Sequence, residues 1–115
     1  WPEALSGDDN QDGLALLLDF GRGRALLLAD LPREVEARLP VGEVEALKVS
    51  HHGSQSGTSE VLLERTRPRV ALIGVGPNPF GHPHPEVLER LERHGAEIRR
   101  TDQGGAVRVL FGYAW

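Results

Sequence analysis

The stretch that decides the fold is VEALKVSHHGS, residues 44–54. Its first six residues form a short, mainly apolar run whose length favours a buried strand. After Ser50 come His51 and His52, followed by Gly53 and Ser54, so both histidines lie in a loop at a strand end. Such loops hold side chains open to a ligand on a fixed backbone, and neutral imidazole is the commonest biological metal ligand. The stretch therefore predicts a buried strand with a candidate site at its carboxyl end.

Upstream of this stretch, two short apolar runs predict a β-hairpin. Residues 14–18 and 25–28 are apolar, and the glycine-containing turn 21–23 separates them. The segment 32–40 begins and ends with proline and has apolar residues four positions apart, which is typical of a short helix.

Downstream, two helices and further strands alternate. The first helix would be capped by Thr58 or Ser59 and would end before Pro68, and the second would begin at Pro85 and end at Gly95. The expected strands are 70–75, 96–101 and 106–111, with the last two paired across residues 102–105. The order β-β-α-β-α-β-α-β-β predicts an α/β fold with one mixed sheet and helices packed on it.

Composition narrows the class of protein. The 115 residues predict a single domain, residues 1–115, in which residues 1–12 form a poorly ordered lead-in. The chain has no cysteine, so any metal would be held by histidine and carboxylate. A net charge of -4 argues against a broad basic surface for nucleic acid. No charged region followed by an apolar region opens the given sequence, and no apolar run is long enough to span a bilayer. Because the sequence begins at Trp1, we expect a piece of a longer polypeptide.

A second histidine pair, His82 and His84, lies just before the last predicted helix. Both pairs have structural alternatives. The pair at 51–52 could be a polar turn hydrogen-bonded by Ser54, and His84 could be an N-cap ahead of Pro85. Two histidine pairs in loops at strand ends nevertheless favour a functional site.

Asp30 ends an apolar run and precedes a predicted helix. It could be the N-cap of that helix. A carboxylate can also bridge two divalent ions, because each of its oxygens can bind one metal. The two roles are compatible.

Four segments together carry a family resemblance. They are LLAD (27–30), LKVSHHGS (47–54), GHPHPEVL (81–88) and Thr101-Asp102. In this order they resemble the C-terminal metallo-β-lactamase domain of ComEC-family DNA-uptake proteins, over residues 10–105. The resemblance implies an αββα sandwich of which this chain would be the C-terminal half, with one sheet face left uncovered. We therefore expect either self-association into a homo-oligomer or an exposed apolar patch.

The resemblance also implies an activity and roles for individual residues. The family domain is similar to a dinuclear zinc or manganese phosphodiesterase, thought to degrade the DNA strand that is not carried through the channel. Asp30 matches the carboxylate that bridges the metals, although Ala29 replaces the usual glycine, and His51 matches the last metal-binding histidine. The positions that match residues near the reacting phosphate are His52, Ser54, His82 and His84.

The main metal motif of the family, His-X-His-X-Asp-His or its variant, does not occur in this chain. Two protein ligands cannot hold a catalytic dinuclear centre. We therefore expect this chain alone to bind metal weakly or not at all and to be inactive. In the complete protein we expect a soluble domain of a bacterial inner-membrane channel, without lipid contact of its own, that acts on single-stranded DNA. The alternatives are a non-catalytic scaffold or DNA-contacting module, or another hydrolase of the metallo-β-lactamase superfamily.

Overall fold

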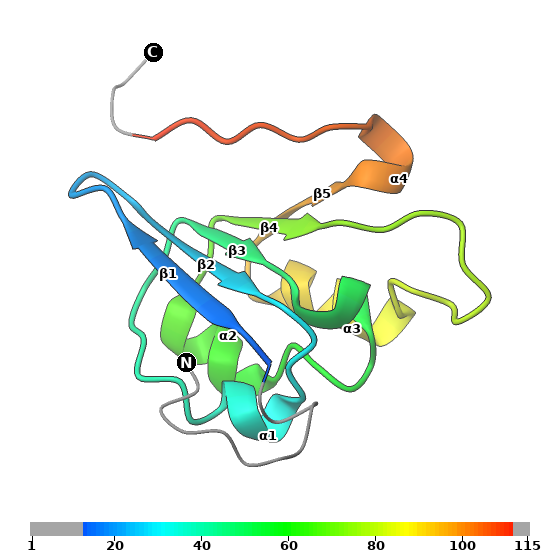
Figure 1. Ribbon diagram of the computed structural model, residues 1–115, viewed down its shortest axis with the longest axis horizontal. Coiled ribbons are helices and arrows are strands. Elements are labelled where there is room, and N and C mark those ends of the chain that lie inside the picture. Colours follow the sequence, from blue (N-terminus) through cyan, green and yellow to red (C-terminus); the bar gives the residue numbers. More distant parts are fainter. Residues whose placement is uncertain (1–12, 112–115) are drawn as a thin grey trace.

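The computed structural model describes residues 13–111, which form one five-stranded sheet with strand order β1-β2-β3-β4-β5 (Figure 1). The hairpin strands β1 and β2 pair antiparallel, and β2, β3, β4 and β5 are parallel to one another. The expected lead-in, residues 1–12, lies outside these residues. The elements are β1 (Ala15–Asp19), β2 (Arg24–Leu28), α1 (Arg33–Glu36), β3 (Ala46–Lys48), η1 (Ser50–Gly53), α2 (Glu60–Thr66), β4 (Val70–Ile73), α3 (Pro85–Arg93), β5 (Glu97–Arg100) and α4 (Thr101–Gly104). The predicted α/β class with one mixed sheet is confirmed.

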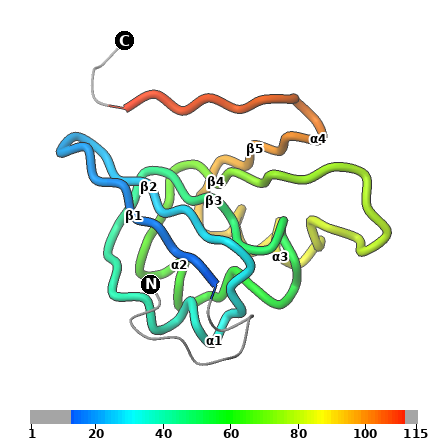
Figure 2. The backbone as a smooth tube through the Cα atoms, in the orientation of Figure 1, coloured from blue at the N-terminus to red at the C-terminus, as the bar shows by residue number. Residues whose placement is uncertain are grey.

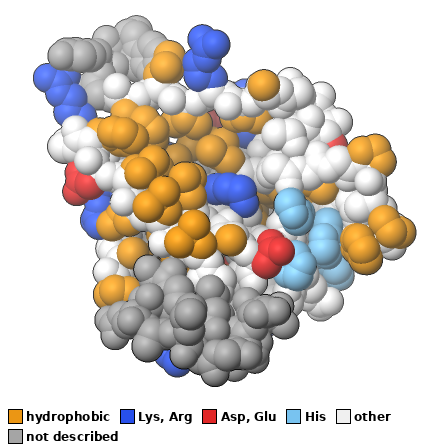
Figure 3. All heavy atoms as spheres, in the orientation of Figure 1, with side chains coloured by type: hydrophobic (Ala, Val, Ile, Leu, Met, Phe, Trp, Pro, Cys, Tyr) orange, Lys and Arg blue, Asp and Glu red, His pale blue; other side chains and the backbone are white. Residues whose placement is uncertain are grey.

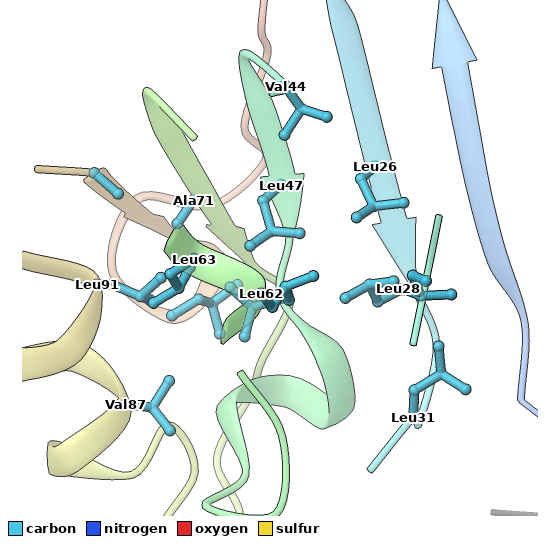
Figure 4. Close-up of a cluster of buried hydrophobic side chains, with 14 of the residues drawn as sticks. Leu26, Leu28, Leu31, Val44, Leu47, Leu62, Leu63, Ala71, Val87 and Leu91 are labelled. Atoms are coloured by element: carbon cyan, nitrogen blue, oxygen red, sulfur yellow. The ribbon is translucent and has the colours of Figure 1, made fainter. Parts of the chain in front are cut away.

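Helices α1, α2 and α3 cover one face of the sheet, as the ribbon and the tube both show (Figures 1 and 2). Leu26 of β2 and Leu47 of β3 point into the layer between sheet and helices, where Leu62 of α2 and Leu91 of α3 meet them (Figure 4). All four are at most 1% exposed. Each buried leucine contributes about 1.5 to 3 kcal/mol, so this layer supplies most of the stability of the fold.

The two longer helices begin as their sequences predict. The Ser59 hydroxyl accepts a hydrogen bond from the backbone N–H of Leu62 and caps α2. His84 caps α3 through its ring, and Pro85 is the first helical residue. Both caps satisfy backbone N–H groups that have no partner inside the helix. The predicted helix at 32–40 is much shorter, because only residues 33–36 are helical.

Within residues 13–111, no helix packs on the other face of the sheet. Strand register places Leu16, Leu27, Lys48 and Leu72 in one row across it, and Leu16 is 45% exposed. Figure 3 shows hydrophobic side chains gathered over β1 and β2 on this face. The expected exposed apolar surface is therefore present, and self-association stays a prediction.

The predicted strand at 106–111 is wrong. After β5 the chain forms the single helical turn α4, closed by a hydrogen bond from the N–H of Gly105 to the carbonyl of Thr101, and residues 106–111 pair with no strand of the described sheet. The Arg100 guanidinium bonds both carboxylate oxygens of Asp102, which favours the helical turn over a hairpin. The segment runs back toward the β1–β2 turn (Figure 2), where Phe111 contacts Phe20 with ring centroids 5.2 Å apart.

Candidate functional site

The carboxyl ends of β2, β3 and β4 lie at one edge of the sheet because the three strands are parallel. Backbone contacts join the loops that follow β2 and β3. The N–H of His51 donates to the carbonyl of Ala29 at 3.2 Å, and the buried Ser50 hydroxyl lies 2.8 Å from the same oxygen. Asp30 is the next residue and is exposed. The structure therefore brings Asp30 and His51, the two predicted metal ligands, to neighbouring positions.

Asp30 does not cap the first helix. The N-cap of α1 is Pro32, and no side chain caps that helix. The alternative role considered for Asp30 is thus wrong, and its exposed carboxylate is available at the carboxyl edge.

Both histidines of η1 have a left-handed backbone. His51 has φ 50° and ψ 42°, and His52 has φ 55° and ψ 26°. This conformation costs an L-residue other than glycine, asparagine or aspartate about 1 to 2 kcal/mol. Strain of this kind persists where the surrounding structure enforces it and is concentrated at functional sites. Two consecutive strained histidines therefore support a functional reading of the loop over a simple polar turn.

A glycine lets the two histidine loops meet. Gly53 has φ +83°, and a Cβ at this position would lie 2.5 Å from the Cβ of Pro83. The N–H of His84 donates to the carbonyl of Gly53 at 2.9 Å. As a result the ring centroids of His51 and His82 are 5.7 Å apart, and Figure 3 shows the histidines gathered at one edge of the molecule.

The 76–82 loop is held from within by Asn78. Its Oδ1 accepts hydrogen bonds from the N–H groups of Phe80 and His82, and its Nδ2 donates to the carbonyl of His82 at 2.9 Å. Asn78 thus hydrogen-bonds both the backbone N–H and the carbonyl of His82. A bond between His82 and Pro83 in the cis form carries the chain on to α3.

Hydrogen-bond partners determine which ring nitrogens are free. His52 Nδ1 lies 2.6 Å from the carbonyl oxygen of Gly74 and must donate to it, so Nε2 of neutral His52 carries a lone pair. His84 Nδ1 accepts from the N–H of Glu86, so its Nε2 carries the proton. The edge therefore offers an acceptor or metal ligand at His52 and a hydrogen-bond donor at His84.

His82 is held in the neutral form. Burial lowers its pKa below the ordinary value of 6.5, and the neighbouring rings of His51, His52 and His84 lower it further. A cluster of imidazoles disfavours additional positive charge on any one of them. At neutral pH, His82 thus provides a neutral ring rather than a cation.

Ser54, the fourth residue predicted near the phosphate, faces its own loop. It is 9% exposed, its hydroxyl lies 3.0 Å from that of Ser56, and it accepts from the N–H of Ser56. These contacts stabilise the turn that follows the histidines. Its catalytic role stays a prediction.

Glu36 was not identified from the sequence, and its carboxylate bonds the backbone of the segment that follows the histidine loop. Glu36 is fully buried, and its carboxylate oxygens accept hydrogen bonds from the N–H groups of Thr58 and Ser59 at 3.0 and 3.2 Å. Burial raises the pKa of this carboxyl group above 4.5, against the lowering effect of the two hydrogen bonds. Gly57 passes close by, since a Cβ there would lie 3.1 Å from Glu36 Oε1. No pattern in the sequence distinguishes one buried glutamate of a four-residue helix that bonds the backbone of a distant segment from an ordinary exposed one.

The described residues do not make a metal site by themselves. Within residues 13–111, no three histidine or carboxylate side chains are placed to hold one metal ion. The open Nε2 of His52 and the carboxylate of Asp30 are suitable donors, but they would need further ligands. In the same part of the chain, no helix is long and apolar enough to cross a membrane.

Comparison with known proteins gives a consistent picture. No family profile matches the chain. It is 41% identical over 107 residues to Recombination protein 2 of Haemophilus influenzae, covering 90% of this chain and 14% of that protein. It is 36% identical over 116 residues to ComE operon protein 3 of Bacillus subtilis, covering 96% of this chain and 15% of that protein. Competence protein ComA of Neisseria gonorrhoeae is 32% identical over 112 residues, covering 91% of this chain and 16% of that protein.

The chain spans about one seventh of the length of these relatives. Over nearly its whole length, the chain is thus similar to one segment of each of these three proteins.

Proposed function

We propose that this chain is part of a DNA phosphodiesterase domain of metallo-β-lactamase type, which acts on single-stranded DNA during competence-related uptake. The observation that carries the proposal is the meeting of His51, His52, His82 and His84 at one sheet edge beside Asp30. The similarity to competence proteins supports the biological setting.

The free ring nitrogens support phosphodiester chemistry. The Nε2–H of His84 can donate to a phosphate oxygen, and the lone pair on Nε2 of His52 can accept a proton or bind a metal. Both rings are oriented by a backbone group, His52 by the carbonyl of Gly74 in another segment and His84 by the N–H of Glu86 in its own turn, as catalytic histidines usually are. The arrangement suits a reaction in which negative charge develops on phosphate oxygens.

A metal would need ligands from outside the described residues. By resemblance, Asp30 and His51 are the ligands this chain offers to zinc or manganese, and the rest of a longer membrane channel protein would supply the others. We assign no step to the metal, because the described residues do not complete a site for it. In this proposal the chain forms one wall of the active site and has little activity alone.

The test compares the full-length protein with this chain. We expect the full-length protein to hydrolyse single-stranded DNA with added manganese or zinc, and this chain alone to show no hydrolysis. His51→Ala should lower the rate of the full-length protein at least about 100-fold. A matched control is His94→Ala, since His94 pairs with Glu60 away from the edge, with 2.5 Å between His94 Nε2 and Glu60 Oε2. Undiminished hydrolysis by the His51 variant would refute the site.

A further inference from the structure

Lys48 is the only lysine of this chain, whose other twelve basic residues, of thirteen, are arginines. Lysine and arginine side chains are not interchangeable. Arginine presents a planar fork, whereas lysine presents a compact ammonium group with three donors that can rotate. Lys48 is therefore the one position of the chain with a compact, rotatable ammonium group.

Lys48 lies on the sheet face opposite α1, α2 and α3. Strand register places it between Leu27 of β2 and Leu72 of β4, so apolar side chains flank it on both sides. Burial lowers the pKa of this ammonium group, and the charge of Asp30 acts in the opposite direction. A half-buried cation in an apolar surface loses hydration that a ligand can replace.

The ammonium group of Lys48 points to the carboxyl edge. Nζ donates a hydrogen bond to the carbonyl of Leu28 at 2.9 Å, at the end of β2 and two residues before Asp30. Among residues 13–111, no carboxylate lies within ion-pair distance of Nζ. Lys48 is therefore not simply the ion-pair partner of Asp30. Of its three protons, one is used by the Leu28 carbonyl.

We propose that Lys48 binds a non-bridging phosphate oxygen of a DNA strand that passes along the carboxyl edge beside the histidine cluster. The inference rests on the proposed function and adds to it a residue that fixes the substrate. The remaining ammonium protons can form charge-assisted hydrogen bonds to phosphate. The Asp30 carboxylate opposes an anion here, and the nearby Lys48 ammonium group supplies the positive charge that offsets this repulsion.

Because Lys48 is the sole lysine, lysine labelled with nitrogen-15 at Nζ yields one side-chain nitrogen signal by NMR in the 115-residue chain. The probe is a short single-stranded oligothymidylate, added at low salt because phosphate contacts weaken as salt rises. We expect the Lys48 signal to shift and saturate together with the backbone amide signals of His51 and His52. This measurement uses the unaltered protein and requires no hydrolysis.

Two substitutions test the contribution of charge. Lys48→Met keeps the length and suits the apolar neighbours, and should weaken oligonucleotide binding about tenfold. Arg99→Met removes the same charge from the same face, since Arg99 lies beside Leu72 in the register, and should weaken binding much less. Unchanged amide spectra away from the substituted residue would show that each variant is folded.

The outcomes separate the two proposals. If the oligonucleotide shifts the His51 and His52 amides without shifting the Lys48 signal, the role of Lys48 is refuted and the proposed function stands. Equal weakening by both substitutions would also refute it, because binding would then depend only on net charge. If the oligonucleotide binds nowhere on this edge, both the role of Lys48 and the DNA-binding wall of the proposed function are refuted.

Discussion

Replacing Glu36 by alanine should lower the free energy of unfolding by about 2 to 4 kcal/mol at neutral pH. Glu36 is fully buried, and its two carboxylate oxygens accept hydrogen bonds from the N–H groups of Thr58 and Ser59. Both donors lie just before α2, on the segment that leads away from the histidine loop. The substitution therefore removes the acceptors for two buried backbone groups at once.

The magnitude follows from these two groups. A buried donor without a partner costs about 1 to 3 kcal/mol, so two cost about 2 to 6 kcal/mol. Removing the buried carboxyl group offsets part of this loss, because burial already disfavours its charged form and raises its pKa. The expected loss is thus below the upper end of the range.

Chemical denaturation monitored by circular dichroism measures the loss. Glu34→Ala is the matched control, since Glu34 is exposed on the same helix and its loss should change stability by less than about 0.5 kcal/mol. A loss below about 1 kcal/mol for the Glu36 variant, or one equal to that of the control, would refute the account of this carboxylate.

Three further predictions concern the same region. Because burial raises the pKa of Glu36 above 4.5, its protonated form is favoured in the folded state. The free energy of unfolding of the wild type, relative to that of Glu36→Gln, should thus be greatest below pH 4.5 and fall as pH rises through the pKa of Glu36 in the folded state. Chemical denaturation at a series of pH values measures this difference. A difference that grows with pH contradicts the prediction. Gly53→Ala should lower the free energy of unfolding by about 2 to 4 kcal/mol, because its Cβ would strike Pro83 at a positive φ. An unchanged thermal midpoint would show that the two loops do not depend on this contact. His51→Gly should be more stable than His51→Ala by about 1 kcal/mol, because glycine relieves the left-handed strain. The reverse order in urea denaturation would argue against strain at this position.

Several features of the fold were predictable because neighbouring residues determine them. Ser59 and His84 lie just before helical segments and can reach the first free N–H groups, so the caps of α2 and α3 follow from local chemistry. The short apolar strands of the hairpin and of β3 and β4 were predictable from their length and flanking turns. The strand predicted at 106–111 failed because a short apolar run alone does not show whether a partner edge is available.

The candidate site was predictable only in part. The histidine pairs are visible in the sequence because each follows a strand or precedes a helix. Their approach to one another is not, since it depends on Gly53 leaving room for Pro83, a contact between residues 30 positions apart. The free nitrogen of His52 depends in the same way on the carbonyl of Gly74.

By itself, the sequence determined the α/β class, the order of the strands and α-helices from β1 to β5 and the loops that carry the histidines, because strand length, caps and turns are local properties. Only the tertiary structure decided that four histidines and Asp30 share one edge, that Glu36 supports it, and that Lys48 lies in an apolar surface. These properties depend on strand register and on close contacts between distant segments, which no local pattern encodes.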